Sequence, residues 1–232
     1  METRAQRIEI SNRNQQDLAQ IIEERRATNS FAKEEIPAAD LSKILHFAGQ
    51  APSGYNLQPW RLIVVRNPEN KKRLRAVAFD QEKVSEASAV IIFVGSKQQT
   101  QDSAPKIFED GNRRGLGKPE KNAEIIQGAL QFIDQQVGWR TWLNRHTMIA
   151  FSFAMLMAES LGYDTAPMEG FDAAGVKREF NIPDDAEVVA LLAIGHAKPP
   201  EKKYPGRLPL NEIAFSESYG SAWSESVPNS GQ

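Results

Sequence analysis

Apolar residues recur at helical spacing in several stretches of the chain. Leucine and isoleucine are spaced in this way between charged and amide side chains over residues 14–26, and Pro37 can begin a second helix that ends near Gly49. Longer patterns occupy residues 123–136 and 139–161. The second is apolar on nearly all sides, which predicts a central helix packed by several neighbours. Shorter helices are expected after Pro68 and at residues 81–88 and 172–180.

Three runs rich in β-branched residues, at 62–66, 89–94 and 187–194, predict buried strands. Strands separated by helices indicate an α/β or α+β fold with one sheet. Residues 97–122 are polar and rich in glycine, proline and charge, which predicts a long excursion loop. Residues 216–232 are rich in serine and poor in apolar side chains, which predicts a flexible tail.

The size and composition are those of an ordinary soluble globular protein. The 232 residues can bury a sizeable core, and 41% of them are hydrophobic. With 28 Lys and Arg against 30 Asp and Glu, the net charge of −2 gives no reason to expect nucleic acid or an anionic membrane as a partner. The chain has no cysteine, so disulfides and thiolate ligands are excluded. The polar start of the chain predicts no secretory signal, and we expect a cytoplasmic protein.

The segment Ala51–Trp60 carries the most concentrated chemistry. It precedes a predicted strand, and Pro52 and Gly54 give its backbone a turn. Ser53 and Asn56 offer hydrogen-bond donors and acceptors. Such a loop can line a pocket for a flat heterocycle with polar edges, although an ordinary connection between a helix and a strand has the same composition.

Four segments in order along the chain carry a more specific signal. Residues 51–60 read APSGYNLQPW, residues 25–31 read RRATNSF, and residues 161–172 read LGYDTAPMEGFD. Gly195-His196 and the GRLP at residues 206–209 close the series. Together these segments closely resemble the motifs of the FMN-dependent nitroreductase family, and the resemblance covers roughly residues 15–215.

The resemblance implies a single domain of α+β type over residues 1–232, with its core at about 15–215 and a mixed central sheet flanked by helices. It further implies an intertwined homodimer with FMN sites at the interface, and residues 211–215 as an arm that crosses to the partner. The implied activity is ping-pong reduction of nitroaromatic, quinone or similar electron-poor acceptors by NAD(P)H, with hydride passing through flavin N5. Bound FMN then does the chemistry, and no catalytic side chain is obligatory.

The resemblance also implies which residues bind the cofactor. Arg25, Arg26 and Arg207 match the basic positions that hold the phosphate, and the backbone amides of Glu169 and Gly170 match those that meet flavin N5. The matching positions are Arg25, Arg26, Ala27, Asn29, Pro52, Ser53, Gly54, Asn56, Gln81, Lys83, Pro167, Met168, Glu169, Gly170 and Arg207.

Two of the matching segments have particular roles in the family. Lys83 would be a cation near flavin N1, with Gln81 beside it, although Asp80 stands where Asn is usual and a solvated helix is the alternative. Ser53 and Asn56 would reach the flavin from the partner subunit.

Three positions depart from the family pattern. Ala27 replaces a common Ser and Asn29 a common Arg or Lys, and Pro205 stands where relatives often have a phosphate-binding Lys. Lys202 or Lys203 offers a substitute for that lysine. These departures leave open a flavin-binding regulator or carrier without turnover. A related flavin enzyme, such as a dehalogenase or an enoate reductase, is a further alternative.

Other chemistries have little support. The histidines at 46, 146 and 196 lack the spacing of a metal site, and we expect none. Residues 111–118 superficially resemble a phosphate-binding loop, but Pro119 stands where that loop needs Ser or Thr. No GxGxxG follows a predicted strand, so NAD(P)H is expected as a transient substrate.

Overall fold

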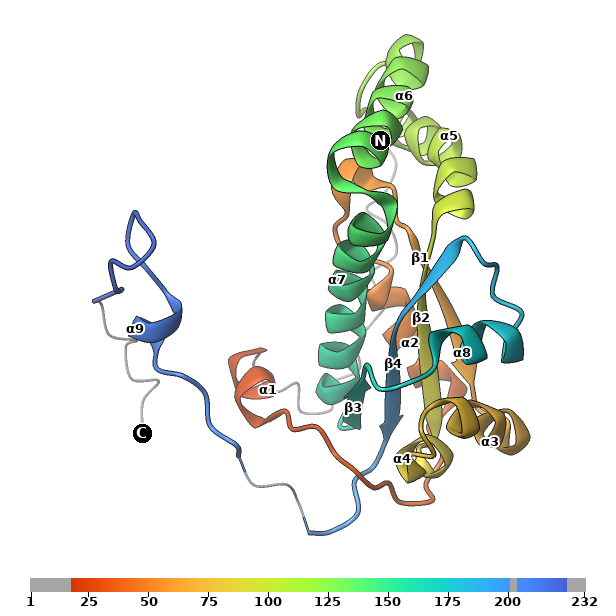
Figure 1. Cartoon of the computed structure of the whole chain (residues 1–232), viewed down its shortest axis with the longest axis vertical. Coiled ribbons are helices and arrows are strands. Elements are labelled where there is room, and N and C mark those ends of the chain that lie inside the picture. The colour runs from red at the N-terminus through yellow and green to blue at the C-terminus, as the bar shows by residue number, and fades with distance from the viewer. Residues whose placement is uncertain (1–17, 201–203, 225–232) are drawn as a thin grey trace. The chain divides into compact units, whose positions relative to one another are not determined.

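The computed structural model describes residues 18–200 and 204–224 (Figure 1). Contacts within the chain divide it after residue 201 into a large unit and a small one, which are described separately. The proposed single domain with a core at 15–215 stays a prediction. In the described part of the chain, no helix is long and apolar enough to cross a membrane.

The large unit is built on a sheet of four strands in the order β1-β2-β4-β3. The strands are β1 (Trp60–Val65), β2 (Ala89–Ser96), β3 (Asp164–Met168) and β4 (Ala186–Gly195). Three were predicted from their apolar runs. The edge strand β3 was missed, because it lies in a segment that resembles a turn and contains Pro167, a residue that sheets tolerate at an edge.

The α+β class is confirmed, with one difference in the sheet. A mixed sheet was expected, whereas each pair of neighbouring strands is antiparallel. Parallel pairing enters through an isolated bridge between Ala27 and Thr165. This bridge sets the position of the segment that follows α1 in the chain, residues 25–31.

One face of the sheet is covered by α2 (Ala38–Ala48) and α7 (Trp139–Ser160), as Figure 1 shows. From the central strand β2, Phe93 and the residues two and four positions before it pack in this layer, as the alternation of side chains along a strand requires. The rings of Phe93 and Phe151 meet edge to face with their centroids 5.0 Å apart. Both helices follow the predicted ranges closely.

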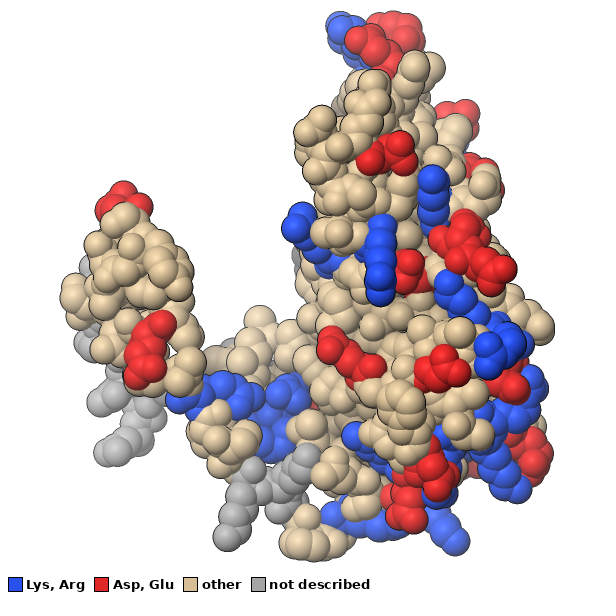
Figure 2. Space-filling view, in the orientation of Figure 1, with Lys and Arg blue, Asp and Glu red and all other residues tan. Residues whose placement is uncertain are grey.

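The opposite face is covered by three shorter helices. They are α3 (Pro68–Val77), α4 (Glu82–Glu86) and α8 (Ala173–Glu179). The intervening residues of β2, Ile92 among them, pack against this layer with Leu74 and Val84. The central strand is therefore buried on both sides. Over the visible face of this layer, basic and acidic side chains are intermixed, as the near-zero net charge leads us to expect (Figure 2).

The excursion loop predicted at 97–122 is wrong, because most of this segment is helical. Ser96 begins the first helix by accepting a hydrogen bond from the backbone amide of Gln99 (3.2 Å). The buried face of this helix is narrow and consists of Thr100 and Ala104, so apolar residues at helical spacing were too few to predict it. The elements are α5 (Lys97–Arg113), a 3-10 turn (Pro119–Lys121), α6 (Asn122–Phe132) and a π turn (Ile133–Val137).

The ends of the described chain are short elements. Helix α1 (Leu18–Glu24) lies within the predicted range 14–26, of which residues 14–17 fall outside the described residues. The small unit contains α9 (Leu210–Ile213), which overlaps residues 211–215, the segment expected to form an arm. Backbone hydrogen bonds follow it, such as Trp223 N to Ala214 O at 3.0 Å. Residues 225–232 lie outside the described part, and the flexible tail stays a prediction.

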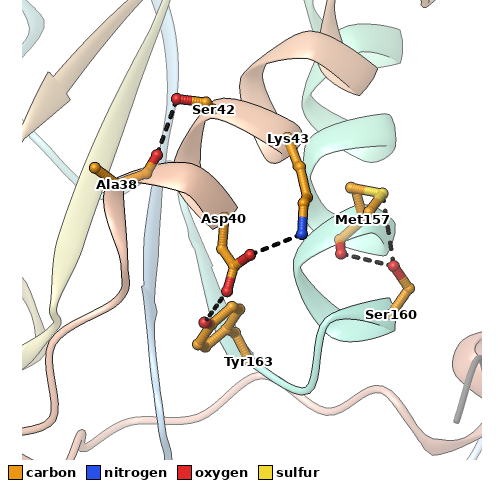
Figure 3. A network of polar contacts seen from close by, with 7 residues as sticks. All are labelled: Ala38, Asp40, Ser42, Lys43, Met157, Ser160 and Tyr163. Atoms are coloured by element: carbon orange, nitrogen blue, oxygen red, sulfur yellow. Dashed lines mark hydrogen bonds and ion pairs between the residues drawn. The ribbon is translucent and has the colours of Figure 1, made fainter. Parts of the chain in front are cut away.

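A small polar network ties α2 to the loop that leads into β3 (Figure 3). The hydroxyl of Tyr163 donates to Asp40 Oδ2 at 2.7 Å, and Lys43 Nζ lies 3.1 Å from Asp40 Oδ1. Burial, together with the carboxylate of Asp40, raises the pKa of Tyr163 to about 12. The hydroxyl therefore stays a donor throughout the physiological pH range.

Tyr163→Phe is expected to lower the free energy of unfolding by about 1.5–3 kcal/mol, because the variant loses one hydrogen bond to a charged group. Urea denaturation at pH 7 measures this. Ser42→Ala is the matched control, because that exposed hydroxyl on α2 bonds the carbonyl of Ala38. Equal losses in the two variants would contradict a special role for the Tyr163 contact.

Candidate functional site

The segment after α1 runs beside the free edge of β3. Ala27 forms a bridge with Thr165, and the backbone amide of Thr28 donates to the carbonyl of Thr165 at 3.0 Å. Two segments singled out in the sequence, 25–31 and 161–172, are therefore in direct contact. Asn29, the next predicted site residue, is exposed.

Arg25 is the most informative side chain of this segment. Its Nη1 is buried and has no hydrogen-bond partner among the described residues. Leaving a buried donor unpaired costs about 1–3 kcal/mol, and more when the group is charged. An anionic oxygen at this position would remove that cost, so the arginine fits a ligand that carries a phosphate or carboxylate.

Arg26 has a different environment from Arg25, although the two were predicted to act together. Its Nη1 donates to the carbonyl oxygens of Glu23 and Arg25, the second at 2.8 Å. Glu23 belongs to the last turn of α1, whose carbonyls lack partners within the helix. In this structure Arg26 therefore caps α1.

Glu159, in the last turn of α7, was missed by the sequence analysis. Its Oε1 accepts a hydrogen bond from the hydroxyl of Thr165 at 2.7 Å. Burial raises the pKa of Glu159 to about 7; Asp164 adds to the rise, while Thr165 and Arg25 oppose it. The sequence did contain a signal for this residue, because an acidic side chain near the end of the most apolar predicted helix is unusual.

The segments predicted to meet the flavin ring are also in contact. Gln81 Nε2 donates to the carbonyl of Gly170 at 2.8 Å and to that of Ala78 at 3.0 Å. The chain reaches Gln81 through a tight turn, in which Phe79 and Asp80 both have φ of 53°. The exposed side chain of Phe79 lies beside Gly170, 3.7 Å from where a Cβ would be.

The remaining residues of this group divide into core and surface. Met168 is buried in the core on the α3 side of the sheet, so its side chain serves packing. Pro167, Glu169 and Gly170 are exposed, and Lys83 is half-buried on α4. The surface that these segments form therefore combines exposed backbone and polar side chains with the apolar side chains of Phe79 and Pro167.

The loop 51–60 is held in a tight conformation. Its 3-10 turn (Gly54–Asn56) includes Tyr55 and Asn56 at φ of 53° and 55°. The hydroxyl of Ser53 accepts a hydrogen bond from the backbone amide of Gln58 at 2.9 Å. Ser53 therefore stabilises the loop, while the exposed Pro52 and Asn56 present its surface.

This loop packs against the first half of α7. A Cβ added at Gly54 would lie 3.3 Å from both Trp142 Nε1 and His146 Nε2. His146 and Glu159 are 13 positions apart on one helix, a separation of about 20 Å along its axis at ~1.5 Å per residue. One chain therefore does not bring the loop to the surface beside Arg25.

Arg207 belongs to the small unit. It is exposed, its Nη1 donates to the carbonyl of Gly206 at 2.7 Å, and its guanidinium lies 5.7 Å from the ring centre of Tyr204. Pro205 is exposed as well, and Lys202 and Lys203 lie outside the described residues. The role of Arg207 stays a prediction. Across residues 18–200 and 204–224, no group of three or more acidic or histidine side chains is arranged to hold a metal ion.

Comparison with known proteins gives one consistent answer. A model of the nitroreductase family matches residues 22–196. The NADH dehydrogenase of Thermus thermophilus is 33% identical over 192 residues, which cover 82% of this chain and 91% of that protein.

Solved structures agree. The Bacillus subtilis protein YdfN, assigned as a nitroreductase, has a TM-score of 0.79 and 31% identity, and the match covers 85% of this chain and 97% of that one. An Exiguobacterium sibiricum protein assigned as a nitroreductase, solved in complex with FMN, has a TM-score of 0.77 and 29% identity, with 87% and 98% covered. The chain belongs to the nitroreductase family.

Proposed function

We propose that this chain is an FMN-dependent oxidoreductase that uses NAD(P)H to reduce nitroaromatic, quinone or similar electron-poor acceptors. The family match and the FMN complex of the Exiguobacterium relative support the cofactor. The name of the Thermus relative supports a nicotinamide donor. In the proposed ping-pong cycle, donor and acceptor occupy the same place in turn.

The buried, unpartnered Nη1 of Arg25 is the observation that carries the cofactor proposal. Arg25 would hold the phosphate, and the exposed backbone at Glu169 and Gly170, next to Gln81, would hold the flavin ring. Bound FMN supplies the redox chemistry by accepting hydride from the nicotinamide and passing reducing equivalents to the acceptor. The chain supplies binding, orientation and a cationic environment.

We further propose a homodimer with shared sites. The loop 51–60 lies against the first half of α7, whereas Arg25 lies beside β3 near the other end of that helix. If both segments contact one flavin, as the family motifs imply, the loop must come from a second chain. Phe153 on α7 is 39% exposed, which leaves apolar surface on this helix for such a partner.

A visible absorption spectrum of the purified protein, before and after anaerobic addition of NADH or NADPH, tests the function. A yellow protein that bleaches supports flavin binding and hydride transfer together, and nitroaromatics, quinones and enones can then be compared as acceptors. A protein that stays colourless after addition of FMN would refute the proposal.

A flavin-binding protein without turnover is the second candidate. Ala27, in the bridge to Thr165, has no hydroxyl where relatives commonly have Ser. Asn29, which is exposed, has no charge where they commonly have Arg or Lys. A yellow protein that neither NADH nor NADPH bleaches would favour this candidate over the oxidoreductase.

Arg207→Ala is expected to lose bound flavin while the fold is retained, because the side chain is exposed and such substitutions usually change stability by less than about 0.5 kcal/mol. The flavin content of the purified variant and its thermal midpoint measure the two effects. Flavin content equal to that of the wild type would remove Arg207 from the phosphate site.

A further inference from the structure

Glu159 lies where a carboxylate is unexpected. Helix α7 is apolar along most of its length, and Glu159 occupies its last turn next to the buried Ala158. The carboxyl is mostly removed from water, yet its Oε1 keeps one strong hydrogen bond, from the hydroxyl of Thr165 at 2.7 Å. A buried acidic group that is held in this way has a defined position.

Thr165 links this carboxyl to the predicted phosphate site. Its side chain donates to Glu159, while its backbone carbonyl accepts from Thr28 and its backbone bridges Ala27. Arg25 is two residues before this bridge. One fully buried residue of β3 therefore holds both the segment that carries Arg25 and the carboxyl of Glu159.

Two charged groups act on the Glu159 carboxyl. Arg25, from the segment after α1, favours the ionised form, and Asp164, from β3, disfavours it. Burial is the largest influence, and it brings the pKa of Glu159 to about 7. Near neutral pH the carboxyl therefore exists in both forms, and its charge is felt by Arg25.

We propose that Glu159 is a positioning residue for Arg25, and that its negative charge competes with the phosphate of the cofactor for this arginine. The proposal rests on the proposed function, because it assigns Arg25 to the phosphate. With Glu159 protonated, the guanidinium is available to the incoming dianion. With Glu159 ionised, the arginine is partly neutralised and two anions share one cation.

The proposal has a thermodynamic consequence with a definite sign. A bound dianion raises the pKa of a neighbouring carboxyl, so binding of FMN takes up a proton from solvent onto Glu159. By linkage, affinity for FMN falls as the pH rises through the pKa of the free protein, near 7. If binding raises the pKa of Glu159 by about one unit, we expect affinity for FMN to fall by about sixfold between pH 6.5 and 8.5, within the usual range of site-to-site coupling.

Two binding measurements test this. The first is the dissociation constant of FMN for the wild-type apoprotein at pH 6.5–8.5, by quenching of flavin fluorescence. The second is calorimetry at pH 7.5 in two buffers of different ionisation enthalpy, which counts protons. We expect uptake of about half a proton per FMN if binding raises the pKa by about one unit. The phosphate itself has a second pKa of about 6 and contributes little at pH 7.5.

Variants separate Glu159 from other titrating groups. Glu159→Gln keeps the shape and an oxygen acceptor, and we expect it to abolish both the proton uptake and the decrease in affinity. Thr165→Val removes the donor that favours the ionised carboxyl, so the decrease should move to higher pH. Glu120→Gln removes an exposed negative charge and should behave as wild type.

The outcomes distinguish the two proposals. A wild-type protein that binds no FMN refutes the proposed function. A protein that binds FMN without proton uptake, or a Glu159→Gln variant with the pH dependence of the wild type, refutes the role of Glu159 and leaves the cofactor assignment standing. An unmoved profile in Thr165→Val also counts against the proposed link.

Discussion

Arg25→Ala should weaken FMN binding by about 10- to 150-fold, which corresponds to the loss of one charged hydrogen-bonding contact of about 1.5–3 kcal/mol. The fold should change little at pH 6.5. Nη1 of Arg25 has no partner to lose among the described residues. Glu159, deprived of its cation, can take up a proton and so avoid an unpaired buried charge.

Titration of the apoprotein with FMN and urea denaturation, both at pH 6.5, measure these effects. Lys72→Ala is the matched control, because it removes the same unit of charge from an exposed position on α3. A similar loss of FMN affinity in both variants would show that the net charge of the protein, and not a contact from Arg25, determines the affinity. A large loss of stability in Arg25→Ala alone would instead make the arginine a structural residue.

The second large effect concerns the stability of the apoprotein, whose free energy of unfolding should fall by about 3 kcal/mol between pH 4.5 and 7 on account of Glu159. The pKa of this carboxyl is 4.5 when unperturbed and about 7 in the folded protein. The folded state therefore binds more protons than the unfolded state in this window, and stability decreases with rising pH. A shift of 2.5 units corresponds to about 3 kcal/mol.

Urea denaturation of the flavin-free protein at intervals between pH 5 and 8 tests this. The wild-type free energy should fall relative to that of Glu159→Gln as the pH rises and become parallel to it above about pH 7. Subtracting the profile of the variant removes the contributions of other titrating groups. Profiles that run parallel over the whole range would show that the carboxyl titrates normally.

Elements with strong local patterns were predicted well. Helix α2 begins after Pro37 and ends at Gly49, as expected. The strands β1, β2 and β4 follow their runs of β-branched residues. These signals depend on side-chain periodicity and on the backbone restrictions of proline, which operate within a few residues.

Elements whose stability comes from distant contacts were missed. Helix α5 buries little besides Thr100 and Ala104, and its many polar residues resemble those of a loop. Strand β3 exists because β4 offers it a hydrogen-bonding edge, although Pro167 within it is a poor strand former. Neither the partner strand nor the packing helix is visible in the local sequence.

The sequence by itself determined the family of this protein and the segments that form its candidate site, because motif residues are read from order and spacing alone. The tertiary structure decided which of those residues have unmet interactions. It separated Arg25, with a buried unpartnered donor, from Arg26, which caps α1. It placed Glu159 beside Thr165, and it set the loop 51–60 against the first half of α7, away from Glu159. Burial, pairing and distance arise only when remote segments pack together, and they determine the charge and the reach of each side chain.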